Sequence, residues 1–263
     1  MLHYRTILNK QSDNWVVMIH GAGGSIEVWY RQVVDFARHF NLLLVDLAGH
    51  GESGAIDMTE GFNFPKAAEQ VMEVVNHLKI KTCHFMGLSL GSIVVRLIAQ
   101  RYPERVTSMV MAGAVTKLGI RLQALIRIAT IFKHILPYGF VKRILAEFLI
   151  PQEKYRGSRN LFLNCAEKVS YDSFVSWIKL GTGIAERIKN LFQEQVPIPT
   201  LYIMGEDDAL FLRHVRNTVS RSKGNHVSLA IVPDAGHVCN VDNKTCFNQL
   251  TIDFIRQVDT SVA

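Results

Sequence analysis

Short apolar runs alternate with longer amphipathic segments along most of the chain. Nearly every residue in six runs is apolar, as expected of strands that helices cover on both faces. These predicted strands are Trp15 to Ile19, Leu42 to Val45, Thr82 to Met86, Ser108 to Ala112, Thr200 to Met204 and Ser228 to Val232, with a shorter one at Tyr4 to Leu8. Apolar residues at helical spacing predict helices over Phe64 to Leu78, Ser92 to Arg101 and Cys246 to Val258. The pattern predicts an α/β fold with a mostly parallel central sheet and helices on both faces.

The alternation stops between residues 116 and 196, where the segment from Leu118 to Ile150 has helical character. We interpret residues 116–196 as a helical cap, inserted between two parts of one core domain at residues 1–115 and 197–263. Five basic residues stand among the large apolar residues of the cap, namely Arg121, Arg127, Lys133, Lys142 and Arg143. We expect the apolar face to pack on the core and the charges to face water, although a basic amphipathic helix can also contact a membrane surface.

Composition narrows the functional classes. A chain of 263 residues that is 48% hydrophobic can bury a large core, and its formal net charge of +6 comes without a long single-sign run, so we expect no nucleic-acid partner. The four cysteines form no CxxC pair, which argues against a zinc site or a disulfide framework. We find neither an N-terminal signal-like segment nor a membrane-spanning run of apolar residues, and we expect a soluble cytoplasmic protein. The oligomeric state stays open.

The strongest chemical signal is the pentapeptide Gly87-Leu88-Ser89-Leu90-Gly91. It follows a predicted strand and precedes a predicted helix, which is the context that a nucleophile elbow requires. On so sharp a turn the serine sits in a strained backbone conformation, and the glycines remove side chains that would collide. The spacing therefore predicts Ser89 as a catalytic nucleophile.

A serine hydroxyl needs a base to take its proton and a third group to orient that base. In this architecture both partners follow the serine, on loops after later strands. The loop after Thr200 to Met204 offers three carboxylates, those of Glu206, Asp207 and Asp208. Among the histidines after that loop, His214 falls in a helix-like segment and His226 precedes a strand, so His237 alone is placed to reach Ser89.

A glycine-rich loop from His20 to Ser25 directly follows the strand Trp15 to Ile19. It has neither the GxGxxG spacing nor the lysine of a phosphate-binding loop. Two amides aimed at one oxygen stabilise a tetrahedral intermediate, and we assign this oxyanion hole to the amides of Ala22 and Leu90.

Together these blocks resemble the α/β-hydrolase superfamily, in particular the small capped bacterial hydrolases that include esterases, lipases and C–C bond hydrolases. The matching segments, in family order, are His20-Gly21, Asp46 to Ser53, Gly87 to Ser92, Gly205 to Asp208 and Ala235 to His237. In relatives a Gly-x-x-Asp loop carries the acid, so the resemblance implies Asp208 rather than Asp207. It also implies that Asp46 and His50 are scaffold residues.

The resemblance also narrows the chemistry. Haloalkane dehalogenases and many epoxide hydrolases use an aspartate at the elbow, where this chain has Ser89. Menaquinone-pathway lyases carry an arginine shortly after the nucleophile, whereas Gly91, Ser92 and Ile93 stand here and Arg96 comes one helical turn later. C–C hydrolases of aromatic degradation often have a tryptophan after the catalytic histidine, where this chain has Val238.

From these residues we predict a serine esterase that acts on a small or medium apolar substrate through an acyl-enzyme, with neither a metal nor an organic cofactor. Two alternatives stay open: C–C bond hydrolysis or lyase chemistry with the same triad, and a ligand receptor without catalysis on the same scaffold.

Overall fold

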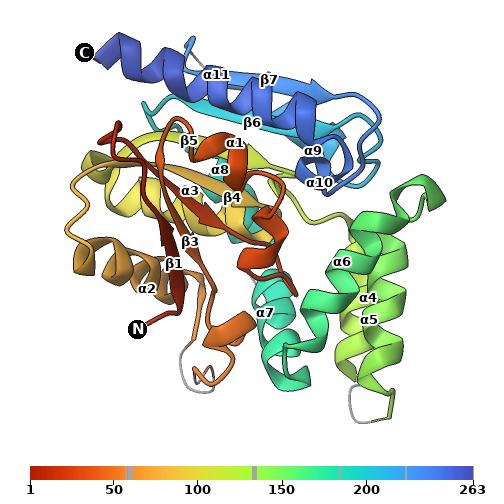
Figure 1. Cartoon of the computed structure of the whole chain (residues 1–263). Helices are drawn as coiled ribbons and strands as arrows, with labels where there is room; N and C mark the ends of the chain where they lie inside the picture. The colour runs from red at the N-terminus through yellow and green to blue at the C-terminus, as the bar shows by residue number, and fades with distance from the viewer. Residues whose placement is uncertain (57, 59–61, 132–134, 184, 223, 263) are drawn as a thin grey trace.

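A computed structural model describes residues 1–263 except 57, 59–61, 132–134, 184, 223 and 263. Seven strands form one sheet in the order β1-β3-β2-β4-β5-β6-β7. Strand β1 pairs antiparallel with β3 and every other pairing is parallel, which confirms the predicted fold class (Figure 1). The strands are β1 Tyr4–Ile7, β2 Trp15–Ile19, β3 Asn41–Val45, β4 Cys83–Leu88, β5 Val106–Ala112, β6 Thr200–Gly205 and β7 Val227–Val232.

Helices cover both faces of the sheet (Figure 1). One face carries α2 Phe64–His77, α3 Leu90–Arg101, α8 Ala185–Gln193 and α9 Leu212–Val219. The other carries α1 Val33–Phe36, α10 Cys239–Asp242 and α11 Lys244–Val262. Successive strand residues point to opposite faces, so Val17 and Ile19 of β2 join the first core whereas Val16 and Met18 join the second.

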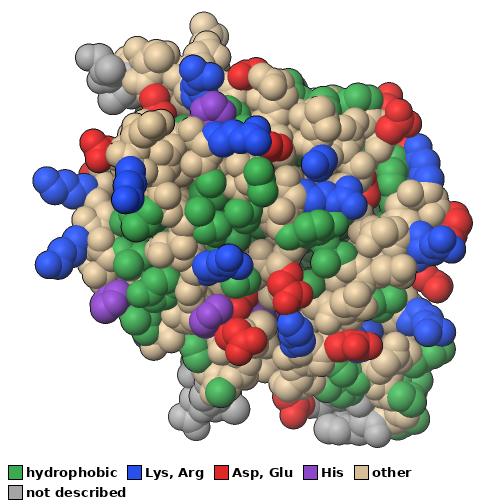
Figure 2. Space-filling model, viewed as in Figure 1, with side chains coloured by type: hydrophobic (Ala, Val, Ile, Leu, Met, Phe, Trp, Pro, Cys, Tyr) green, Lys and Arg blue, Asp and Glu red, His purple; other side chains and the backbone are tan. Residues whose placement is uncertain are grey.

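The surface in Figure 2 carries Lys, Arg, Asp and Glu side chains, with hydrophobic side chains exposed between them. No helix of the described ranges is both long enough and apolar enough to cross a lipid bilayer.

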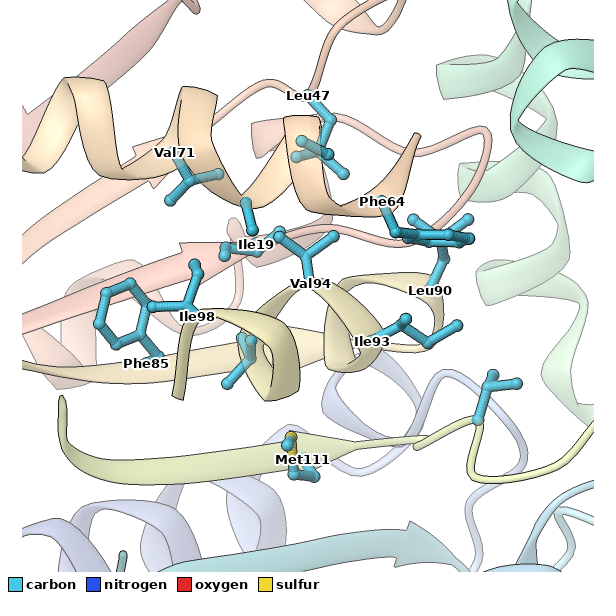
Figure 3. Close-up of a cluster of buried hydrophobic side chains, with 14 of the residues drawn as sticks. Ile19, Leu47, Phe64, Val71, Phe85, Leu90, Ile93, Val94, Ile98 and Met111 are labelled. Atoms are coloured by element: carbon cyan, nitrogen blue, oxygen red, sulfur yellow. The ribbon is translucent and has the colours of Figure 1, made fainter. Parts of the chain in front are cut away.

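The core beside α3 fixes the position of the serine elbow. Figure 3 shows Val94 and Ile98 of α3 among Ile19 of β2 and Phe85 of β4. All four side chains are fully buried. Because α3 begins directly after Ser89, this packing holds the serine at the carboxyl end of the sheet.

Five helices lie between β5 and β6, in the range predicted as a cap: α4 Ile120–Ile131, α5 Tyr138–Leu149, α6 Arg156–Glu167, α7 Tyr171–Gly183 and α8. In Figure 1, α4 to α7 project from one end of the sheet, whereas α8 packs against α3. Of the five basic residues singled out in this range, Lys133 lies outside the described residues. Lys142 does not face water as expected: it is buried, with its Nζ atom 4.9 Å from the centre of the Tyr138 ring.

Trp177 of α7 joins this helical segment to the rest of the protein. Its indole Nε1–H donates a hydrogen bond of 2.8 Å to the carbonyl of Ala48, and its side chain is fully buried. The rings of His50, Phe62 and Phe64 contact the indole edge to face. One side chain therefore combines a buried hydrogen bond with an aromatic cluster.

We expect Trp177→Ala to lower the free energy of unfolding by about 3–5 kcal/mol, because it leaves a large cavity and removes a buried hydrogen bond to the Ala48 carbonyl. Urea denaturation followed by circular dichroism measures the change. Ile131→Ala, at a side chain that is 70% exposed, serves as the control and should change stability by less than about 0.5 kcal/mol. Equal effects of the two substitutions would show that the indole is not an anchor.

Candidate active site

Ser89 occupies a sharp turn between β4 and α3. Its backbone has φ 52° and ψ −116°, a region that L-residues rarely adopt, and its amide donates to the Ala112 carbonyl at 2.9 Å. A Cβ atom at Gly87 would lie 2.5 Å from the Gly91 carbonyl oxygen, and one at Gly91 would lie 2.4 Å from the Ile19 carbonyl oxygen. Both glycines are therefore required sterically, which gives the pentapeptide a physical cause.

The structure brings Ser89, His237 and Asp208 into one hydrogen-bonded chain. His237 Nε2 lies 2.9 Å from Ser89 Oγ, and His237 Nδ1 lies 2.8 Å from Asp208 Oδ2. Because a carboxylate can only accept, Nδ1 carries the proton and Nε2 is free to accept the serine proton. The other oxygen, Asp208 Oδ1, accepts from the amide of Phe211 at 3.0 Å. Both Asp208 and His237 are buried, so the bond between them is shielded from water, whereas Ser89 is half-buried.

The loops that carry the acid and the histidine lie directly against each other. The Asp207 amide donates to the Ala235 carbonyl at 2.9 Å, and a Cβ atom at Gly205 would lie 2.1 Å from the Gly236 carbonyl oxygen. Only glycine allows this approach. The Phe211 ring packs on the His237 imidazole, with ring centroids 4.8 Å apart. Backbone pairing and ring packing together fix the orientation of the histidine.

The neighbouring carboxylates of the acidic loop are occupied elsewhere. Asp207 Oδ2 accepts from the Tyr155 hydroxyl at 2.6 Å and lies 2.7 Å from Lys154 Nζ. These two hydrogen bonds, with Lys154 the stronger cause, lower the pKa of Asp207. Glu206 is exposed. Of the three carboxylates that the sequence offered, Asp208 is the one bonded to His237.

Asp242 is a residue of this site that the sequence analysis did not find. Its Oδ2 atom accepts from the Gly236 amide at 2.9 Å, directly before His237, and its Oδ1 atom accepts from the Ser158 hydroxyl. Burial raises the pKa of Asp242. The only signal in the sequence was its place five residues after His237. Asp242 links helix α6 to the histidine loop.

The glycine-rich loop lies beside the serine. A Cβ atom at Gly21 would lie 3.1 Å from Ser89 Cβ, so the backbone passes directly over the nucleophile. The amides of Ala22 and Leu90 donate to no other group in the part of the chain that the structure describes. His50 Nε2 accepts from the Gly23 amide at 2.9 Å and so supports the loop next to Ala22.

Two buried histidines, His20 and His50, support this loop, and both are in their neutral form. His20 Nε2 accepts from the Leu47 amide at 3.0 Å, so His20 Nδ1–H donates to the Gly21 carbonyl. Burial lowers the pKa of His20, and burial together with repulsion from His20 lowers the pKa of His50 from 6.5 to about 3. Protonation of either ring would remove the acceptor of a backbone amide.

This arrangement predicts acid sensitivity. Since the folded pKa of His50 lies below its unfolded value, the unfolded chain binds more protons, and stability present above pH 6.5 is lost as the pH falls toward 3. At about pH 5 the His50 share of this loss is about 2 kcal/mol. Urea denaturation at several pH values measures it. His50→Gln, which keeps an acceptor for Gly23, should show a shallower pH dependence, and an unchanged slope would contradict the assignment.

Two apolar hollows lie beside Ser89. The first, about 70 Å³, is bounded by α5 and α6, with Leu149, Leu161 and Phe162 among its walls. The second, about 90 Å³, is bounded by α4, α7 and α8, with Leu122 and Trp177 among its walls. The walls shared by both hollows are Ala22, Ser89, Leu145 and Leu149. No Lys or Arg of the described chain lines either hollow.

Arg96 does not reach the serine. Its Nη2 atom donates to the Glu194 carbonyl at 2.7 Å, and its side chain lines a separate hollow of about 310 Å³ between α8 and α9. Arg96, the first basic residue after Ser89 in the sequence, is therefore directed away from the candidate site.

Comparisons with known proteins agree with this architecture. The family model for the alpha/beta hydrolase fold matches residues 14–244. The chain is similar to pimeloyl-(acyl-carrier protein) methyl ester esterase of Yersinia enterocolitica, with 27% identity over 95% of this chain and 96% of that protein. It is 24% identical to a putative 2-succinyl-6-hydroxy-2,4-cyclohexadiene-1-carboxylate synthase of Bacillus subtilis, over 92% and 90% of the two chains. Among solved structures, MenH from S. aureus superposes with a TM-score of 0.85 at 17% identity, covering 98% of this chain and 100% of that one. Since the family model spans most of the sequence, the protein belongs to the α/β-hydrolase family.

Proposed function

We propose that the protein is a serine hydrolase that cleaves carboxylic esters through an acyl-enzyme. The observation that carries this proposal is the hydrogen-bonded chain from Ser89 Oγ through His237 to Asp208, at 2.9 and 2.8 Å, open to two apolar hollows. Each side chain has the geometry that its role needs.

In the first half of the reaction, Ser89 Oγ attacks the ester carbonyl carbon while His237 Nε2 takes the serine proton. The resulting imidazolium is stabilised by Asp208. The tetrahedral intermediate collapses, His237 gives its proton to the leaving alcohol oxygen, and the acyl group stays bound to Ser89.

In the second half, a water molecule attacks the acyl carbon and loses a proton to His237 Nε2. Collapse of the second intermediate breaks the bond to Ser89 Oγ, which recovers its proton from His237. One water is consumed, and one alcohol and one carboxylic acid are released.

The negative charge that develops on the carbonyl oxygen needs donors in fixed positions. The backbone amides of Ala22 and Leu90 supply them, since both lack another partner among the described residues. Leu90 also begins helix α3, whose N-terminal dipole favours an anion. The close approach of Gly21 to Ser89 supports the position of the first donor.

The hollows favour an apolar ester over an acidic substrate. An apolar substrate would bind there by burying its apolar surface against the walls, which contributes roughly 25 cal/mol per Å². Ligand pockets are lined mainly by apolar side chains for this reason. The B. subtilis relative carries the name of a carboxylate synthase, which raises lyase chemistry as the alternative. An acidic substrate of that kind would need a cation, such as an arginine, in the pocket. Arg96 instead bonds the Glu194 carbonyl, so ester cleavage has the stronger support.

A series of p-nitrophenyl esters of increasing acyl length tests the proposal. We expect kcat/KM to rise from acetyl to a medium-length acyl chain and to fall once the chain exceeds the hollows, because added methylene groups gain apolar burial only while they fit. Release of nitrophenol measures turnover. Absence of turnover on every ester, with the protein folded, would refute ester hydrolysis.

A further inference from the structure

The outer side of the α4–α5 hairpin exposes an unusual number of large apolar side chains. Of the ten large hydrophobic residues that are exposed in the described chain, six belong to this hairpin. Ile120, Ile131 and Ile135 are 83%, 70% and 74% exposed. We call the six residues the hairpin face: Ile120, Ile128, Ile131, Ile135, Phe140 and Ile144. A concentration of exposed apolar side chains on one pair of helices indicates an interaction site.

Exposed arginines accompany the hairpin face on both helices. Residues 120–149, from the start of α4 to the end of α5, contain five Lys and Arg and one acidic residue, Glu147. Arg121, Arg127 and Arg143 are exposed on α4 and α5 beside the isoleucines. Figure 2 shows hydrophobic side chains at the surface over the lower end of this hairpin, with Lys and Arg side chains at its edge. An apolar face with basic neighbours is the pattern of a helix that lies on an anionic bilayer.

The hairpin face also leads toward the serine. A hollow of about 50 Å³ between α4 and α5 is lined by apolar residues only, and Ile128 and Ile144 of the hairpin face stand among them. Ile126 and Leu145 line this hollow and also line the second hollow at Ser89. The outer hollow and the hollow at the serine therefore share two walls.

We propose that the hairpin face docks on an anionic lipid bilayer and that apolar esters pass from the bilayer to Ser89 between α4 and α5. The second half of this statement rests on the proposed ester hydrolysis, whereas the docking does not. An apolar ester partitions into lipid, so a bilayer-facing entrance places the enzyme where its substrate is concentrated.

A second copy of the chain fits this surface less well. Symmetric pairing of two hairpin faces would bring Arg121, Arg127 and Arg143 of one copy close to the same arginines of the other. Like charges across an interface are unfavourable, whereas phosphate groups of anionic lipids complement them.

Cosedimentation with vesicles tests the docking, using the full chain with Ser89→Ala so that turnover plays no part. We expect binding to vesicles of equal phosphatidylcholine and phosphatidylglycerol at least about tenfold stronger than to phosphatidylcholine alone. Combined replacement of Arg121, Arg127 and Arg143 by Gln should weaken partitioning about 100-fold. Combined replacement of Ile120, Ile131 and Ile135 by Ser should weaken it about tenfold or more.

Matched substitutions elsewhere on the surface provide the controls. Leu8→Ser with Val34→Ser removes apolar residues that are 67% and 64% exposed, and Arg38→Gln with Lys66→Gln and Arg156→Gln removes three exposed charges. Each control should leave vesicle binding within about twofold of the parent protein. Equal losses in hairpin and control variants, or no binding to the anionic vesicles, would overturn the docking. Sedimentation velocity tests whether a second copy of the chain occupies the hairpin face instead. If the parent protein does not bind vesicles but forms a dimer that the Ile→Ser substitutions dissociate, the face belongs to a dimer interface.

Substrate delivery has its own measurement in protein that keeps Ser89. The Ile→Ser variant should lose about tenfold in turnover of a long-chain ester carried in anionic vesicles, and should keep its turnover of a short water-soluble ester. Equal loss on both esters would refute the entrance between α4 and α5. If no ester is cleaved by the parent protein while vesicle binding persists, ester hydrolysis fails and the docking stands.

Discussion

Replacing Ser89 by Ala is expected to lower kcat on short-chain p-nitrophenyl esters by at least about 10⁴-fold, because it removes the proposed nucleophile of the acyl-enzyme. Ser89 Oγ lies 2.9 Å from His237 Nε2, and once it is removed we expect the remaining rate enhancement to come from substrate binding and the proposed oxyanion donors.

The folded state serves as the control for this substitution. The elbow conformation is held by the backbone bond from the Ser89 amide to Ala112 and by the close packing at Gly87 and Gly91, which the change leaves intact. The urea midpoint should therefore stay close to that of the parent protein. Retention of most of the turnover by a folded variant would remove Ser89 from the role of nucleophile.

The second large effect is expected at the acid of the candidate triad and distinguishes Asp208 from its neighbour Asp207. Asp208→Asn should lower kcat by about 10⁴-fold, since an amide at this position favours the wrong tautomer of His237 and does not stabilise an imidazolium. Asp207→Asn is the matched control, because Asp207 bonds Tyr155 and Lys154 instead of the histidine. We expect that variant to lose less than about tenfold. Initial rates on one ester decide the matter, and a larger loss at Asp207 would reverse the assignment of the acid.

The sequence predicted the strands and helices whose apolar residues follow a regular pattern. The six principal strands lie within a few residues of their predicted ranges because each is a nearly continuous apolar run, and β1 was found as well. The antiparallel direction of β1 was not predicted, since direction depends on pairing between distant strands and leaves no local pattern. Lys142 was expected in water but is buried against Tyr138, because its aliphatic stem packs while its ammonium group meets an aromatic ring.

Ser89 and His237 could be selected because each follows a strand and stands in a short motif, whereas the choice of Asp208 among three neighbouring carboxylates came from the family resemblance. The residues that hold the triad in place could not be selected. Asp242, Ser158 and Phe211 act through contacts between separate elements, and none belongs to a motif. Tyr155 and Lys154 likewise reach Asp207 from a segment far away in the chain. Such contacts follow from tertiary packing, which the pattern of a single element does not encode.

The central claim is that the Ser89 hydroxyl is an activated nucleophile, and covalent labelling tests it most directly. A fluorophosphonate should form one adduct per chain, and peptide mass spectrometry should map it to Ser89. Labelling should slow by at least about 100-fold when His237→Ala removes the base. An adduct on another residue would contradict the account. So would the absence of any adduct on a folded protein that retains both Ser89 and His237.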